Sequence, residues 1–298
     1  SNNYLGLVVG IIFQTMQTLF ANGIINACLY DEVKDEEEFS KMIVVRSIFS
    51  DTGYGIAMIL GGIIADINLV MMYYISLIPV SLNFIVILLL DNVKSKENTS
   101  VSFKEILKDA KDIIKKKKLI RYLFLYQGLL VAFVSILMET HPEYSSNLGI
   151  SASIIGMYTA IMLLFGILGQ HIASKIKSDN IKIFVFPVII SIFLIIIGLL
   201  NHPLCIILII FIELLYDGQY NGMISLMHDN ISDTSRVTME GFLSLITGIF
   251  GIVIGTILTI ILKFIDVQTM YILIGITLLI YILFLFIIYK KYITKKSE

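Results

Sequence analysis

Two carboxylates stand one helical turn apart in an otherwise apolar stretch of the chain. Glu213 lies nine residues from the beginning of the segment 204–227, and Asp217 follows four residues later. In a membrane-spanning helix, nine residues correspond to about 14 Å of depth, close to the bilayer midplane. A charge there is costly unless it faces a cavity or a partner, and two neighbouring carboxylates tend to share a proton. The pair suits proton exchange or binding of a cationic group; a structural, hydrogen-bonded acid is the alternative.

A second polar group lies near the start of the chain. Gln14, Gln17, Thr18 and Asn22 recur at helical spacing, so they form one face of a helix over residues 4–30. Such a face either lines a cavity or makes hydrogen bonds to neighbouring helices. Further along the chain, a single amide in an apolar segment, Gln127, is another candidate cavity residue.

Charged residues near the ends of the first two apolar segments suggest a gate. Asp31 and Arg46 flank the short polar loop between these segments, where an ion pair would hold the two helix ends together. Asp51 lies about five residues inside the second segment. Arg236 lies in a similar polar loop later in the chain. The alternative for all four is ordinary charge at the membrane surface.

The composition of the chain is that of a membrane protein. Of 298 residues, 57% are hydrophobic and only 15% are charged, and the mean hydropathy is +0.89. Soluble domains contain about 45–50% apolar and about 25% charged residues. A net charge of −1 gives no sign of nucleic-acid binding.

Nine apolar segments are long enough to span a bilayer as helices, since a span needs about 20 residues. Their continuous apolar character lacks the alternation of a membrane barrel. We therefore predict an all-α polytopic membrane protein with spans at 4–30, 42–67, 70–90, 119–137, 153–173, 183–200, 204–227, 241–263 and 267–289.

The basic residues fix a predicted orientation. With residue 1 outside and residue 298 in the cytoplasm, every Lys and Arg except Lys263 falls in an inner segment or at a helix end beside one. This agrees with the positive-inside rule. We expect a multi-pass protein of the plasma (inner) membrane, with a cytoplasmic C-terminus.

A polar, charged stretch divides the chain. We predict a partial N-terminal bundle over 1–90, a cytoplasmic amphipathic linker over 91–118, and a C-terminal six-helix bundle over 119–298. Spans one to three match spans seven to nine in layout, which is typical of transporters that bind substrate between two repeats. The GxxxG pairs Gly218/Gly222 and Gly251/Gly255 predict close helix contacts.

Short motifs resemble those of the major facilitator superfamily. The stretch from Ala21 to Asp31, the loop from Glu38 to Arg46 and the run from Gly61 to Asp66 are similar to that family's fourth helix, the inner loop that follows it and its fifth helix. The loop from Asn230 to Thr238 resembles the one between its tenth and eleventh helices. The resemblance implies a two-bundle fold in which this chain supplies family helices 4–12 and the first three precede residue 1. The family's signature inner loop is absent, and the segment 172–178 is a degenerate copy.

The resemblance implies a secondary active transporter of a small molecule, working by alternating access. Proton-coupled efflux is our expectation; the alternatives are a solute-uptake symporter and an inactive, truncated transporter. The expected partners are a small-molecule substrate, protons or another coupling ion, and the bilayer, and we expect a monomer. The chain has no P-loop, no dinucleotide fingerprint and no His spacing for a metal. No cofactor or metal is therefore expected, and a membrane-embedded enzyme is disfavoured because no cluster of reactive side chains is evident.

Overall fold

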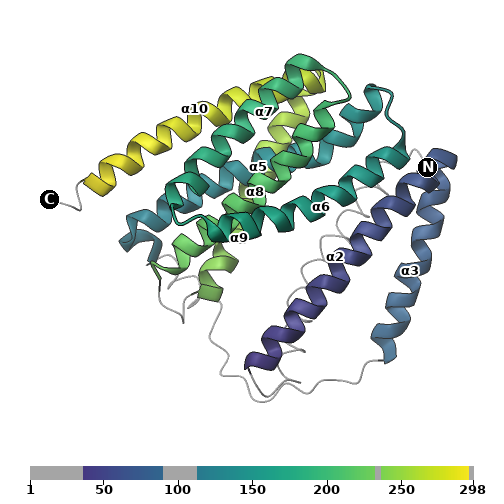
Figure 1. The fold of residues 1–298 in the computed structure, drawn as a ribbon, viewed down its shortest axis with the longest axis horizontal. Coiled ribbons are helices and arrows are strands. Elements are labelled where there is room, and N and C mark those ends of the chain that lie inside the picture. The colour runs from purple at the N-terminus through teal and green to yellow at the C-terminus, as the bar shows by residue number, and fades with distance from the viewer. Residues whose placement is uncertain (1–35, 90–112, 232–235, 295–298) are drawn as a thin grey trace. The chain divides into compact units, whose positions relative to one another are not determined.

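The computed structural model describes residues 36–89, 113–231 and 236–294, and these are helical almost throughout. Figure 1 shows the helices in chain order from purple to yellow. Their bounds are α2 Glu36–Ile67, α3 Leu69–Leu89, α5 Lys118–Asn147, α6 Ala152–Lys175, the π-helical turn Ile181–Val185, α7 Phe186–Leu200, α8 Cys205–His228, α9 Arg236–Ile261 and α10 Val267–Thr294.

In this described part of the chain, eight helices are long and apolar enough to cross a membrane. They correspond to predicted spans two to nine. Most ends shift by six residues or fewer, but α5 runs to Asn147, ten residues past the predicted end at 137. The first predicted span, 4–30, and most of the amphipathic linker lie outside the described residues. The all-α polytopic fold is thus confirmed. The structure shows a multi-pass membrane protein, because helices this apolar need lipid around them.

Contacts divide the chain into two compact units. One comprises residues 1–54 and 73–100, and the other comprises 55–72 and 101–298. The second unit therefore combines residues 55–67 of α2 and the first residues of α3 with the six helices α5 to α10. The predicted domain limits 1–90, 91–118 and 119–298 stay a prediction.

The second unit is built around α5. The middle of α5 is mostly buried, and its fully enclosed side chains include Leu123, Tyr126 and Leu137. Three helix pairs run along one another: α6 with α8, α7 with α10, and α5 with α9. By contrast α9 is largely exposed, so one side of it is left open in the described structure.

Short turns, two of them with polar caps, join consecutive helices at the predicted outer face. Asn68 separates α2 from α3, and its side-chain oxygen accepts from the amides of Val70 and Met71 at 2.8 and 3.2 Å. Gly149, with φ +79°, turns the chain between α5 and α6. Asp266 caps α10 by accepting from the Thr269 amide at 2.8 Å. These caps satisfy amides that a helix cannot pair internally.

Glycines set the closest helix contacts. A Cβ on Gly169 of α6 would overlap the Leu214 carbonyl of α8, and one on Gly218 would lie 2.9 Å from the Gly169 carbonyl oxygen. A Cβ on Gly222 would lie 2.7 Å from that of Lys182. The close contact predicted for Gly218/Gly222 is thus confirmed. For the other GxxxG pair, in α9, an added Cβ would meet no described atom within 4 Å.

Candidate functional site

The two α8 carboxylates face α6. A Cβ on Gly166 of α6 would lie 2.6 Å from Asp217 Oδ2 and 3.7 Å from Glu213 Cγ, so the absence of a side chain at Gly166 leaves room for both acids. Gln170, one turn further along α6, donates from Nε2 to Asp217 Oδ2 at 3.0 Å. Both carboxylates are only partly exposed.

Glu213 differs from its neighbour in its hydrogen bonding. Its Oε2 atom is buried and has no hydrogen-bond partner among the described residues. An ionised oxygen in that position would lack the donors that compensate for lost water, which costs free energy. Asp217 has such a donor in Gln170. The two acids therefore lie in unequal environments, an arrangement that suits exchange of a proton or a cation.

Gln127 is placed inside the helix bundle. It is fully buried on α5 and accepts at Oε1 from Gln219 Nε2 of α8 at 3.0 Å. Beside it, Tyr126 donates to the Ile183 carbonyl at 2.7 Å. Gln127 Nε2 and Gln219 Oε1 have no described partner. The structure places Gln127 in a buried polar contact, whose other half, Gln219, the sequence did not single out. The role of Gln127 as a cavity residue stays a prediction.

The roles predicted for all of these site residues stay predictions. Arg46 is half-buried and Asp51 exposed, both on α2. Arg236 is the first residue of α9, and its side chain lies outside the described part. The other four also lie outside it: Gln14, Gln17, Asn22 and Asp31.

A groove between α5 and α9 was not foreseen. Its volume is about 740 Å³, within the range of about 300–1,000 Å³ typical of ligand sites. Glu139 and Lys263 lie at its predicted outer end. The lining comes from two helices: Val131, Ala132, Ser135, Ile136 and Glu139 on α5, and Ser244, Thr247, Gly248, Gly251, Ile252, Gly255, Thr256, Thr259, Ile260 and the nearby Lys263 on the α9 side.

The hydroxyl groups in this groove are oriented by their own helix. Thr247, Thr256 and Thr259 donate to the carbonyls of Ser244, Ile252 and Gly255 at 3.0, 2.7 and 2.8 Å. Each hydroxyl hydrogen is thereby engaged, and the oxygen keeps lone pairs that accept. The groove consequently presents acceptors to any molecule within it. Small polar residues in an apolar helix are its only sequence signal, and they are equally compatible with a lipid-facing surface.

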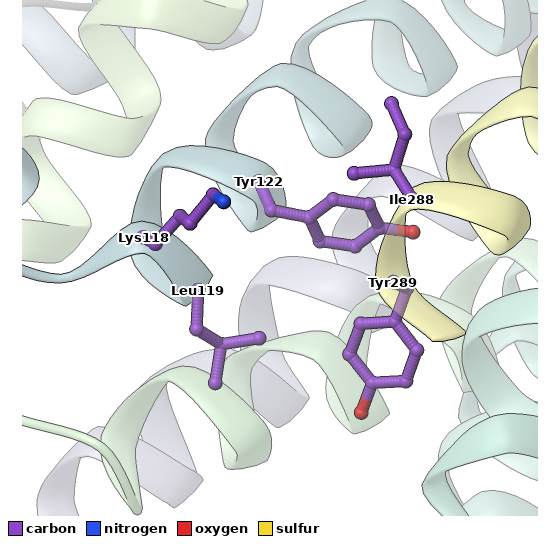
Figure 2. Close-up of a pocket in the computed structure, with 5 residues that line it drawn as sticks. All are labelled: Lys118, Leu119, Tyr122, Ile288 and Tyr289. Carbon is purple, nitrogen blue, oxygen red and sulfur yellow. The ribbon is translucent and has the colours of Figure 1, made fainter. Parts of the chain in front are cut away.

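A much smaller cavity lies where α5 begins and α10 nears its end. Lys118, Leu119, Tyr122, Ile288 and Tyr289 enclose about 20 Å³, room for about one water molecule. Figure 2 shows the Tyr122 hydroxyl beside Ile288 and the Tyr289 hydroxyl pointing away from it. The Tyr122 hydroxyl is buried without a described partner. The cavity is too small to bind a solute.

Two further polar contacts join helices of the bundle. His228 Nε2 of α8 lies 2.6 Å from Glu240 Oε1 of α9. Near the predicted outer end, the buried Tyr158 hydroxyl is 2.7 Å from both His141 Nδ1 and Ser145 Oγ. In the described residues no three His, Cys, Asp or Glu side chains gather as a metal site would need.

A bundle of long apolar helices of this kind defines a class, the polytopic α-helical membrane proteins. The family model of the Major Facilitator Superfamily matches residues 1–212. The chain therefore belongs to this superfamily of secondary membrane transporters. The match ends one residue before Glu213, so the family model gives no information about the two α8 carboxylates. None of the curated proteins compared with the chain matches it.

Proposed function

We propose that the protein couples the efflux of a small amphipathic cation to proton entry, with Glu213 and Asp217 of α8 as the exchanging carboxylates. The observation that carries the proposal is the buried, partnerless Glu213 Oε2 one turn from Asp217. A carboxylic acid in this position changes its charge state only when a proton or a cation arrives, which links the two. Because the family transports solutes, this linkage would couple the movement of protons to the movement of the solute.

The α5–α9 groove supports the choice of solute. Its hydroxyl oxygens accept hydrogen bonds, and Glu139 adds a carboxylate at one end. Its apolar surface comes from residues such as Val131 and Ile252. Acceptors combined with apolar walls favour a molecule that carries donors or positive charge on an apolar frame.

The test is transport in proteoliposomes with ethidium as the probe. An acidic lumen should drive ethidium inward through inside-out protein, and pyranine in the lumen should report proton loss at the same time. With Glu213→Gln, gradient-driven accumulation should fall at least tenfold, whereas exchange of ethidium at equal pH should persist. Glu143→Gln is the matched control, because Glu143 is exposed on α5 and lies outside both sites.

Uptake is the second candidate, and the same vesicles separate it from efflux. Dye that enters together with protons from an acidic exterior would indicate symport. Accumulation that is unchanged in both Glu213→Gln and Asp217→Asn would remove these residues from the coupling step.

A further inference from the structure

Five basic side chains gather where α5 begins, at the predicted inner face. All are exposed, and they form what we term the basic cluster: Lys115, Lys116, Lys117, Lys118 and Arg121. Lys117 donates from Nζ to the carbonyl of Asn230, just after α8. Asp179, whose charge acts on Tyr289 of α10, is paired with Lys182 at 2.9 Å, so it leaves the charge of the cluster uncancelled. Basic residues that adjoin a membrane span attract anionic lipid.

A buried hydroxyl lies beside the basic cluster. Tyr122 is only 9% exposed, and its hydroxyl has no hydrogen-bond partner among the described residues. Figure 2 shows the Tyr122 ring between Lys118 of α5 and Ile288 of α10, at the small cavity that all three line. The cavity has room for a single oxygen atom. A water molecule there would satisfy the hydroxyl alone, whereas an oxygen of an anionic phosphate would also compensate the charge of the cluster.

The same two helices present apolar surface to the membrane. Leu125, one turn after Arg121, is exposed, and so are Phe284 and Ile288 of α10. Tyr281 of α10 donates to the Leu125 carbonyl at 2.9 Å, so α5 and α10 run together from the cavity into the membrane. A free anion gains nothing from this surface, but acyl chains do. Positive charge at the helix ends and apolar side chains beyond them match the two parts of a phospholipid.

We infer that the inner ends of α5 and α10 bind one anionic phospholipid. Its phosphate lies between Lys118 and Arg121, and one phosphate oxygen enters the cavity and accepts from the Tyr122 hydroxyl. Its acyl chains lie along the exposed side chains of α10. The inference is independent of the proposed efflux, because it uses neither the α8 carboxylates nor the α5–α9 groove.

Lipid binding to the purified protein tests the site. The protein in detergent is titrated with phosphatidylglycerol and, separately, with phosphatidylcholine that has the same acyl chains. Native mass spectrometry should show that the first lipid to bind is phosphatidylglycerol, with a dissociation constant about tenfold lower than that of phosphatidylcholine. Phosphatidylglycerol should also raise the melting temperature, since it binds the folded state. Equal affinity for the two lipids would overturn the inference.

Charge removal distinguishes a built site from general attraction to a basic surface. Lys118→Gln together with Arg121→Gln should weaken phosphatidylglycerol binding about tenfold. The matched control is Lys175→Gln together with Lys177→Gln, which removes the same charge from exposed residues at the end of α6, also at the predicted inner face. This control should keep the wild-type affinity. Equal losses in the two double variants would show that only surface charge attracts the lipid, which contradicts the site.

Tyr122→Phe separates lipid binding from folding. It deletes a hydroxyl that has no described partner, so without lipid the melting temperature should equal or exceed that of wild type. The affinity for phosphatidylglycerol should nevertheless fall about threefold or more. Tyr281→Phe is the control, because it deletes a hydroxyl between the same helices that bonds the Leu125 carbonyl. It should lower the melting temperature and leave the lipid affinity unchanged. Wild-type lipid affinity in Tyr122→Phe would overturn the site.

Inorganic phosphate distinguishes a lipid headgroup from a free anion. A large excess of inorganic phosphate, at constant ionic strength, should displace little phosphatidylglycerol and should leave the melting temperature unchanged, because it has no chains to place along Leu125 and Phe284. Complete displacement of the lipid, or an equal rise in melting temperature with inorganic phosphate alone, would identify a free-anion site and would overturn the assignment to a phospholipid.

Discussion

Gln219 of α8 donates a 3.0 Å hydrogen bond to Gln127 of α5, and both side chains are fully buried. Because helices in lipid gain nothing from hiding apolar surface from each other, polar contacts such as this one help to specify which helices pack together. The contact fixes α5 and α8 beside each other inside the bundle, and α8 is the helix that carries Glu213 and Asp217.

Breaking one side of this amide pair should destabilise the bundle. Gln127→Leu or Gln219→Leu alone leaves a buried amide without its partner, which should cost about 1–3 kcal/mol. The double substitution removes both amides and should cost less than the sum of the two. The unfolding free energy in detergent, measured as a double-mutant cycle, checks this expectation. A strictly additive cycle would show that the two amides do not depend on each other.

Most of the fold could be predicted from the sequence, because span length and hydropathy are local properties. Eight spans appear where the apolar runs place them, and the depth of Glu213 follows from counting residues. The partners of these residues could not be predicted. Gln170 meets Asp217 only because Gly169 lets α6 lie directly against α8, and that pairing depends on the whole bundle.

The groove was missed for a related reason. Its threonines donate to carbonyls of their own helix, as threonines do in many apolar helices, so their spacing alone does not distinguish a solute surface from a lipid-facing one. Gln127 illustrates the converse. An isolated amide in an apolar span is compatible with a cavity or with a buried contact, and its hydrogen-bond partner, Gln219, lies 92 residues away in the chain, so the sequence alone could not reveal it.

Replacing Gly166 of α6, which lies against Asp217 and Glu213, should affect transport more than stability. In Gly166→Ala the new methyl would stand 2.6 Å from Asp217 Oδ2, so the carboxylate must move away from Gln170. We expect gradient-driven ethidium accumulation to fall at least fivefold while the melting temperature in detergent stays within about 2 °C, because the displaced group is one flexible side chain. Gly241→Ala is the control, since a Cβ there meets no described atom. Equal transport in the two variants would contradict the placement of Asp217.

Replacing Gly169, three residues further along α6, should instead lower the stability of the bundle. In Gly169→Ala the new methyl would overlap the Leu214 carbonyl, and backbone cannot move aside as a side chain does. The α6–α8 contact must then widen, which we expect to cost about 1–3 kcal/mol, as for other overpacked sites. The loss should appear as a lower midpoint of unfolding, measured by intrinsic tyrosine fluorescence. A midpoint equal to that of Gly241→Ala would show that the two helices are not in this close contact.

Removing hydroxyl acceptors from the groove should weaken solute binding. Thr256→Val and Thr247→Val keep the side-chain shape but delete the hydroxyl of a residue that lines the groove. Each should raise the half-saturation concentration for ethidium about three- to tenfold, as expected for the loss of a hydrogen bond of about 1 kcal/mol. Thr159→Val is the matched control, because Thr159 also donates to its own helix, to the Ile155 carbonyl at 2.7 Å, but lies on α6 away from the groove. If all three variants have the wild-type half-saturation value, the groove is not the solute surface.

The cap of α10 should make stability depend on pH in the acidic range. Hydrogen bonds from the Thr269 side chain and backbone lower the pKa of Asp266 below its usual 3.8. Because the pKa is lower in the folded state, the stabilisation is fully present above the unfolded value and disappears as pH falls through the folded value. Asp266→Ala should therefore lower the melting temperature at pH 7, and the difference from wild type should shrink below pH 3.8. Asp266→Asn, which retains an acceptor but cannot ionise, is the control: its melting temperature should lie between the other two at pH 7 and should lack the acidic transition. A difference between wild type and Asp266→Ala that stays constant down to pH 2 would show that the charge of Asp266 has no part in the cap.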